Sequence, residues 1–218
     1  MSYGNGVALT DRYLFPGAWP FPAVAGPLAT PLLLWWALRR EKLTWREVGL
    51  GLGRALRGAA LGTLGGLAMA GAALAVLHFP LVIPGPVTYG RVQAMETGDV
   101  VARALVTMPL DTVLPEEVAF RGVLLALFLR RFSVTPAVLF SSLVFVLWHP
   151  LVNYHTLTNT NLATSPVLLA VGLTGAHLGV LLGGVVFCVL QLWPGHLAAP
   201  VAAHWAVNAG ILAGLALR

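Results

Sequence analysis

Charge is what this sequence has least of. Only 10% of its 218 residues are charged, against roughly a quarter in an ordinary soluble domain. Asp, Glu, Lys and Arg are absent from three long stretches, Tyr13 to Leu38, Gly58 to Gly90 and Phe132 to Leu217. Because 58% of the residues are hydrophobic, the chain has too little polar surface for a globule in water. The composition therefore predicts a membrane protein.

Cysteine is also scarce, and the basic residues are not spread as in a nucleic-acid-binding protein. Cys188 is the only cysteine, which excludes an internal disulfide and a thiolate cluster for zinc. Much of the net charge of +5 comes from one short loop, residues 39–57. Its basic residues are Arg39, Arg40, Lys42, Arg46, Arg54 and Arg57. Such a cluster is typical of a cytoplasmic loop, so we expect this loop to be cytoplasmic and expect no nucleic-acid partner.

The uncharged stretches are long enough to cross a bilayer, which takes about 20 apolar residues. We predict an all-α polytopic membrane protein, a bundle of about six transmembrane helices. The expected helices cover residues 21–38, 59–79, 100–131, 135–152, 166–192 and 197–217. No flexible linker or low-complexity tract divides the chain. Residues 1–218 are therefore expected to form one domain in a cell membrane, with the lipid bilayer as its surroundings.

Small residues predict two places where helices pack closely. They recur every fourth position, on one face of a helix, so that another helix can approach. The positions are Gly58, Gly62, Gly66 and Ala70 in the second helix, and Gly175, Gly179 and Gly183 in the fifth.

Prolines and polar runs predict where the helices are interrupted. Pro109 or Pro115 is expected to break or kink the third helix. The polar segment 153–165 is expected to form a loop on the non-cytoplasmic side, and residues 193–195 a tight turn. Tryptophans near the helix ends, among them Trp148 and Trp205, are expected to anchor the protein at the membrane interface.

The third helix carries ionisable residues at a depth where a charge is costly. Glu117 and Arg121 are four residues apart with the acid first, which favours an ion pair within the helix. Such a pair can be purely structural. Glu116 is rotated by about 100° from Glu117, so it needs another partner. It is either a protonated, hydrogen-bonded acid or a functional carboxylate.

Two further helices each carry a pair of residues on one face. Phe145 and His149 are four apart in the fourth helix, and His204 and Asn208 are four apart in the sixth. A single membrane histidine is most often a packed residue. Together, the three helices bring a carboxylate, two imidazoles and an amide to depths where they can meet, which is enough for a hydrolytic site.

Three motifs carry a family resemblance. "EEVAFR" at 116–121 fits EExxxR, "FVLWH" at 145–149 fits FxxxH, and "HWAVN" at 204–208 fits HxxxN. In this order, the motifs resemble those of the CAAX protease and bacteriocin-processing (CPBP, or Abi) family of glutamic-type intramembrane proteases. The resemblance covers residues 110–210, which we take as the catalytic core. "WPGHL" at 193–197 replaces a Thr-Gly-Ser-Leu-like sequence that is more usual there, which leaves the substrate open.

The resemblance implies an intramembrane endopeptidase that cuts a membrane-anchored or C-terminal-tail peptide, without a cofactor or a metal. By similarity, Glu116 would be the general base that takes a proton from water. His149 would hold or polarise this water, and His204 and Asn208 would donate hydrogen bonds to the oxyanion. The small size of the chain favours a prokaryotic enzyme of an inner or plasma membrane.

The supporting residues follow from the same resemblance. Glu117 and Arg121 would fix the third helix and keep the general base aimed, and Phe145 would pack beside the histidine of its motif.

Other functions stay open. A zinc metalloprotease could use Glu116, His149 and His204 as a His2Glu set, although the usual HExxH spacing is absent. A non-enzymatic immunity or scaffold protein could keep the polar cluster for packing specificity. A transporter would need a continuous polar path, and the first, second and fifth helices offer almost no side chains to line one.

Overall fold

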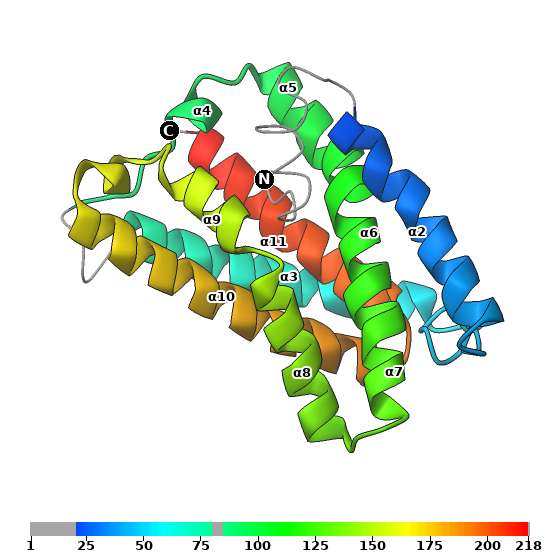
Figure 1. The fold of residues 1–218 in the computed structure, drawn as a ribbon. Helices are drawn as coiled ribbons and strands as arrows, with labels where there is room; N and C mark the ends of the chain where they lie inside the picture. The colour runs from blue at the N-terminus through cyan, green and yellow to red at the C-terminus, as the bar shows by residue number, and fades with distance from the viewer. Residues whose placement is uncertain (1–20, 80–84, 218) are drawn as a thin grey trace.

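The computed structural model describes residues 21–79 and 85–217, with the side chains of 21–25 excepted. Most of these residues are helical, and their only strand-like pairing is an isolated bridge between Tyr89 and Thr160. The first elements are α2 (Phe21–Arg39), α3 (Ala55–His78), α4 (Gly90–Gln93) and α5 (Thr97–Ala102), followed by η2 (Arg103–Thr107), η3 (Pro109–Val113), α6 (Leu114–Glu117), η4 (Val118–Leu124) and α7 (Leu125–Leu129). The rest are α8 (Val134–Leu147), α9 (Pro150–Leu157), η5 (Asn161–Thr164), α10 (Pro166–Leu192) and α11 (Ala198–Ala216), arranged as Figure 1 shows.

The helical membrane protein expected from composition is confirmed, but the number of six spans is not. Among the described residues, α3, α10 and α11 are long and apolar enough to cross a membrane. α8 and α9 form a fourth candidate if the pair, which is bent by 48°, counts as one span. The other two expected spans correspond to α2 and to the run from α5 to α7, and they stay predictions.

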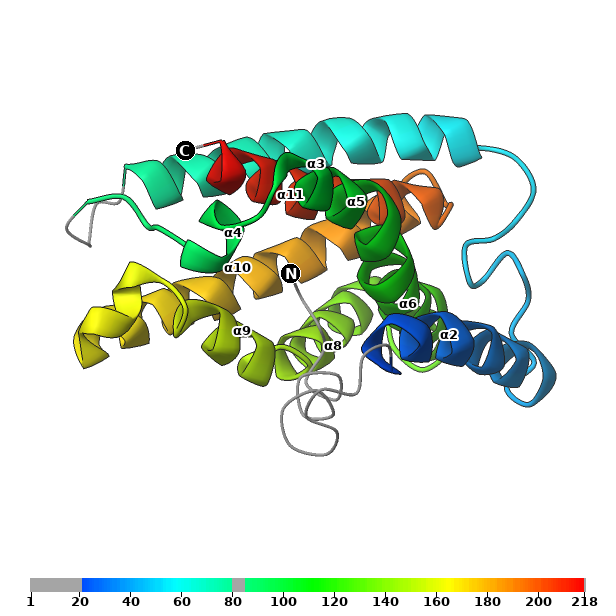
Figure 2. The ribbon, with the colours of Figure 1, turned by 90° about the horizontal axis from the view of Figure 1, so that it is seen from above.

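Small residues bring α3 and α11 into close contact, as the first glycine pattern predicts (Figure 2). The buried residues of α3 are Gly58, Gly62, Gly66 and Ala70. A Cβ added at Gly62 would collide with the carbonyl oxygen of Ala199, and one at Gly66 with that of Ala203. The contacts advance in the same direction along both helices, so α3 and α11 run parallel.

The second glycine pattern makes a helix contact only at its last member, Gly183, where an added Cβ would lie 3.8 Å from Cε of Met69 in α3. No described residue comes within 4 Å of a Cβ placed at Gly175 or Gly179. α10 instead approaches α8 through Gly184, where an added Cβ would lie 3.1 Å from the Cβ of Ser142. A repeat of glycines shows that a helix can be approached closely on that face, but not that a neighbour lies there.

The third predicted helix is a continuous helical run from α5 to α7, so it has no break at Pro109 or Pro115, and the kink expected as the alternative stays a prediction. Three stretches of it, η2, η3 and η4, are π-helical. A π-helical turn bonds residues five apart, so it can carry the helix past a proline that lacks an N–H. Two of these stretches flank the short segment α6, which contains both glutamates of the EExxxR motif.

The fourth predicted helix ends earlier than expected. α8 stops at Leu147, and α9 begins at Pro150 and runs to Leu157, through part of the predicted loop 153–165. Pro150 has no N–H to continue the hydrogen bonding of α8, but it is well suited to the first turn of a new helix. His149 therefore lies at the junction between two helices.

Arg130, which follows α7, lies against the basic loop 39–57. Arg130 bonds to the Glu47 carboxylate through Nε (2.8 Å) and Nη2 (3.0 Å), and to the carbonyls of Glu41 (2.7 Å) and Lys42 (2.8 Å). The Arg130 guanidinium lowers the pKa of Glu47 to about 2. These bonds fasten the loop between α2 and α3 to the end of α7.

Candidate active site

Glu116 lies in α6 and is 5% exposed. Its Oε1 accepts a hydrogen bond from the indole Nε1 of Trp148 at 3.2 Å. Its Oε2 lies 3.8 Å from Nε2 of His149, is buried, and has no hydrogen-bond partner among the described residues. One oxygen of this carboxylate is therefore held by the protein, and the other faces an imidazole without bonding to it.

His149 is oriented by the backbone at the end of α8. Its Nδ1 lies 2.6 Å from the carbonyl oxygen of Phe145. This carbonyl is free because the His149 N–H bonds to Val146, three residues back, and not to Phe145. A carbonyl can only accept, so Nδ1 is the donor, and Nε2 is the ring nitrogen that faces Glu116.

Glu117 binds two partners through one oxygen. Its Oε1 accepts hydrogen bonds from Arg121 Nη1 at 2.9 Å and from His204 Nδ1 at 2.7 Å. The side chains of Glu117 and Arg121 are fully buried. The predicted ion pair of Glu117 and Arg121 is therefore present. The hydrogen bond between Glu117 and His204 of α11 is not predicted from the sequence.

Aromatic rings surround the charged groups. The guanidinium carbon of Arg121 lies 3.9 Å from the centre of the Phe145 ring. Phe145 also packs edge-on against His149, with ring centres 4.4 Å apart, as expected of it. The His204 ring stacks on Phe187 of α10 at 5.1 Å. These rings keep the ionic groups away from lipid and reduce the freedom of both histidines.

Asn208 is half-buried on α11, one helical turn beyond His204. Its Nδ2 is buried and has no hydrogen-bond partner among the described residues. Unpaired buried donors of this kind are rare in folded proteins. This amide is therefore a donor with unused capacity.

The predicted residues form two neighbouring acid–histidine pairs, Glu116 with His149 and Glu117 with His204. The described part of the chain contains no group of three or more His, Cys, Asp or Glu side chains that could hold a metal ion. The zinc alternative with Glu116, His149 and His204 therefore has no support from the geometry.

Two residues of the site are not predicted from the sequence. Trp148, expected as an interface anchor, donates its indole N–H to Glu116, and its position next to His149 within "FVLWH" is a usable signal. Phe187 stacks on His204 from a helix with no motif, so nothing in the sequence points to it. Trp205 also donates inward, to the carbonyl of Ala104 at 2.8 Å.

A further buried carboxylate lies outside the site. Asp111 in η3 forms an ion pair with Arg103 and also accepts a hydrogen bond from Thr112. Both oxygens of the Asp111 carboxylate therefore have a partner, unlike those of Glu116.

Comparison with family models matches residues 96–210 to the model described as type II CAAX prenyl endopeptidase Rce1-like. Comparison with curated proteins and with solved structures gives no match. The matched residues cover more than half of the chain and include all three motifs, with both acid–histidine pairs. The resemblance read from the motifs is thus confirmed. With its apolar helices and this match, the chain belongs to the Rce1-like family of type II CAAX endopeptidases and is a membrane-embedded protease.

Proposed function

We propose that this protease hydrolyses a peptide bond of a membrane-associated protein or peptide with a water molecule activated by Glu116. The observation that carries the proposal is the pair of facing atoms, Glu116 Oε2 and His149 Nε2, which lie 3.8 Å apart and do not bond to each other. Both atoms are hydrogen-bond acceptors when the carboxyl group is ionised and the ring is neutral.

Water is the natural partner for two such acceptors. The gap exceeds the usual limit of about 3.2 Å for a direct hydrogen bond. A water molecule has two O–H donors, and lying about 2.8 Å from each atom it can give one hydrogen to Glu116 and one to His149. Its oxygen lone pairs then point away from both residues, toward a substrate carbonyl.

The proposed reaction needs no group beyond these side chains. The water oxygen attacks the carbonyl carbon while one of its protons passes to Glu116, and the carbonyl oxygen becomes an oxyanion. When the tetrahedral intermediate collapses, the C–N bond breaks. Glu116 then returns its proton to the leaving amine, so the protein ends the cycle unchanged.

His204 and Asn208 are proposed to stabilise the oxyanion. With both ring nitrogens protonated, His204 donates from Nδ1 to Glu117 and has Nε2 for the oxyanion. The unpaired Nδ2 of Asn208 supplies a second donor. One such donor is commonly worth about 3 kcal/mol of transition-state stabilisation.

Glu117 and Arg121 are proposed as positioning residues. Because Glu117 Oε1 accepts from both Arg121 and His204, it joins the helical run that carries Glu116 to the helix that carries the oxyanion donors. Phe145 contributes its carbonyl to His149 and its ring to Arg121.

The test is a comparison of membrane proteomes from cells with the wild-type protein and with Glu116→Gln. The amide keeps the size of the side chain but removes the base. We expect at least one membrane peptide to stay uncut in the variant and to be cut by the matched control Asp111→Asn, which alters a buried carboxylate outside the site. Normal cleavage by a well-expressed Glu116→Gln protein would refute the role of Glu116.

Chelation separates this mechanism from the metalloprotease alternative. Once a cleaved peptide is known, the purified protein is expected to keep its activity after thorough chelation. Activity that is lost on chelation and restored by zinc would instead favour a metal bound by Glu116, His149 and His204.

A further inference from the structure

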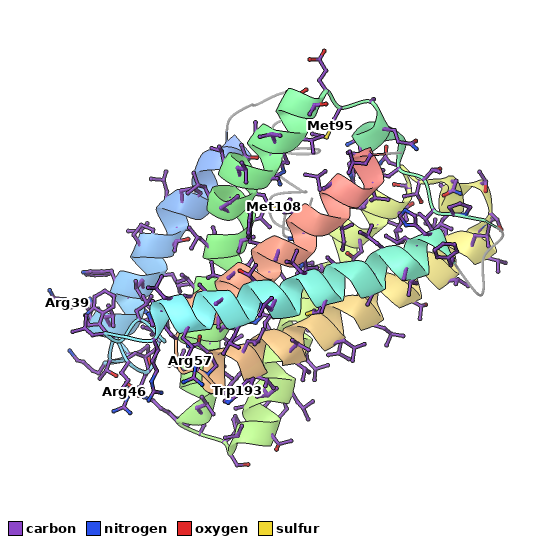
Figure 3. All side chains as sticks on the ribbon, turned by 180° about the vertical axis from the view of Figure 1, so that it is seen from behind. Arg39, Arg46, Arg57, Met95, Met108 and Trp193 are labelled. Atoms are coloured by element: carbon purple, nitrogen blue, oxygen red, sulfur yellow. The ribbon has the colours of Figure 1, made fainter. Side chains whose placement is uncertain are left out.

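A pocket lies at the basic end of the molecule. It has a volume of about 250 Å³ and opens between the start of α3 and the turn that joins α10 to α11. Its lining is Arg54, Arg57, Leu61, Trp193 and Pro194. Figure 3 shows Arg57 and Trp193 near each other at this end, where Arg39 and Arg46 also lie.

Nothing in the described part of the chain neutralises the two arginines of this pocket. Neither guanidinium makes a hydrogen bond or an ion pair there, and no acidic residue lines the pocket. Glu47, an acid of the same loop, is already bonded to Arg130. Two free guanidinium groups on one pocket are suited to bind an anion with several oxygen atoms, such as a phosphate.

The backbone of Arg54 has a left-handed conformation, which costs conformational free energy for a residue other than glycine. Arg54 has φ 62° and ψ −3°, in the left-handed region that residues other than glycine seldom adopt. Its Nη1 lies across the pocket, 3.7 Å from the place where a Cβ of Gly195 would be. Arg54 also immediately precedes α3, whose N-terminal end carries partial positive charge. Such strain is often kept where a side chain must point at a ligand.

The surroundings of the pocket favour a lipid over a soluble anion. α3 and α10 are candidate membrane spans, and the pocket lies where α3 begins and α10 ends. In a bilayer crossed by these helices, their ends would lie at the depth of the lipid head groups. Trp193 is 70% exposed there, as is common for tryptophan at this level of a membrane. Leu61 lies farther along α3, toward the acyl chains. A soluble anion would use the arginines but gain nothing from these apolar residues.

We propose that this pocket binds the phosphate head group of an anionic membrane lipid, with the phosphate on Arg54 and Arg57 and the lipid tails descending past Leu61. Basic pockets between transmembrane helices are known to bind such head groups. The site lies apart from Glu116 and His149, and its occupancy does not depend on the proposed catalytic mechanism.

The test is lipid binding to the purified full chain in detergent, measured by native mass spectrometry with phosphatidylglycerol and with phosphatidylcholine. The variant Arg54→Gln/Arg57→Gln removes two positive charges from the pocket. The control Arg39→Gln/Arg40→Gln removes two from the same loop outside it. We expect wild type to prefer phosphatidylglycerol, the pocket variant to bind it at least about tenfold more weakly, and the control to stay within about twofold of wild type.

Three results would overturn the proposal. The pocket variant could keep the preference for the anionic lipid, or the control could lose it equally, which would indicate diffuse attraction to a basic surface. Inorganic phosphate at millimolar concentration could displace the lipid, which would indicate a site for a soluble anion. The single variant Arg57→Gln, expected to give an intermediate loss, leaves the strained backbone at Arg54 untouched and serves if the double variant unfolds.

Discussion

Glu116 and Glu117 are neighbours in the chain, but the partners of their Oε1 atoms differ in charge. Glu117 is fully buried and its Oε1 bonds to Arg121 and His204. Glu116 is held through Oε1 by the neutral indole of Trp148, and its Oε2 has no partner. Oε2 of Glu117 also has no partner among the described residues, so the two acids differ in the charge of their partners: Glu117 is fixed by opposite charge and Glu116 by a neutral donor.

This difference predicts unequal effects on stability. Glu117→Ala would leave the Arg121 guanidinium buried without an acid, and breaking a buried ion pair in this way costs roughly 3–5 kcal/mol. Glu116→Ala removes no charge partner of an arginine. We therefore expect Glu117→Ala to unfold at a clearly lower temperature than Glu116→Ala, as measured by tryptophan fluorescence in detergent. Equal unfolding temperatures would contradict the distinction.

At the scale of single residues, the sequence predicts the motif residues better than it predicts their partners. Spacing by four is enough to pair Glu117 with Arg121, because both lie on one face of one helix. The bond from Glu117 to His204 joins residues 87 positions apart, and only the packing of α11 against the run from α5 to α7 creates it. Phe187 is missed for the same reason.

At the scale of whole helices, the glycine pattern of α3 sets how closely α11 approaches it. The backbone of α11 lies so close to Gly62 and Gly66 that no side chain fits between them. Ala203, which lies against Gly66, directly precedes His204. The position of the histidine therefore depends on how closely the two helices approach.

Two glycines of α3 allow a matched test of this contact. Gly62→Ala would collide with Ala199 and force the helices apart, at a cost of typically 1–3 kcal/mol. Gly71→Ala, on the same helix, meets no described atom within 4 Å. It is expected to be neutral or stabilising by up to about 1 kcal/mol, because alanine favours helix. Thermal unfolding of both variants in detergent checks this, and a similar loss in each would argue against close packing at Gly62.

Helix ends follow from the sequence where composition changes sharply. The fifth predicted helix has the bounds of α10, because Pro166 begins it and Trp193 to Gly195 end it. The prediction that the polar stretch 153–165 is a loop is wrong for its first part, because Asn153 to Leu157 belong to helix α9. Polar residues indicate exposure to water, but a short helix can be exposed as well.

At the scale of the whole molecule, Arg130 joins parts of the chain that are far apart in sequence. It fastens the loop after α2 to the end of α7, and the Leu197 N–H, which donates to the Gly49 carbonyl at 2.7 Å, ties the same loop to the turn before α11. The basic end is therefore a connected unit, although its many positive charges repel one another.

This connection predicts a dependence of stability on pH. Arg130 lowers the pKa of Glu47 to about 2 from the ordinary 4.5. A lowered pKa in the folded state means that the stabilisation is present above about pH 4.5 and is lost as the pH falls toward 2. The Glu47 side chain is 35% exposed, so we expect about 1 kcal/mol or less. The difference in unfolding temperature between wild type and Glu47→Gln should shrink as the pH falls through this range, and a constant difference would contradict it.

The overall architecture is predicted from the sequence only in part. The apolar stretches are enough for a helical membrane protein, because length and lack of charge decide whether a helix can cross a bilayer. They do not fix the number of spans, since the run from α5 to α7 contains charged residues and π-helical stretches, and α8 and α9 are bent. That the three motifs meet in one place follows from family resemblance and not from hydropathy.

Because of the junction at Pro150, the group that orients His149 is a main-chain carbonyl and not a side chain. Many enzymes orient a histidine with an acidic side chain, which a single substitution can delete. Here the acceptor is the main-chain oxygen of Phe145, which every amino acid at position 145 would provide. The side chain at position 145 can therefore change without loss of the hydrogen bond that orients His149. A replacement of Pro150 that restores a regular α-helix would instead let the His149 N–H bond to the Phe145 carbonyl and compete with the ring for it.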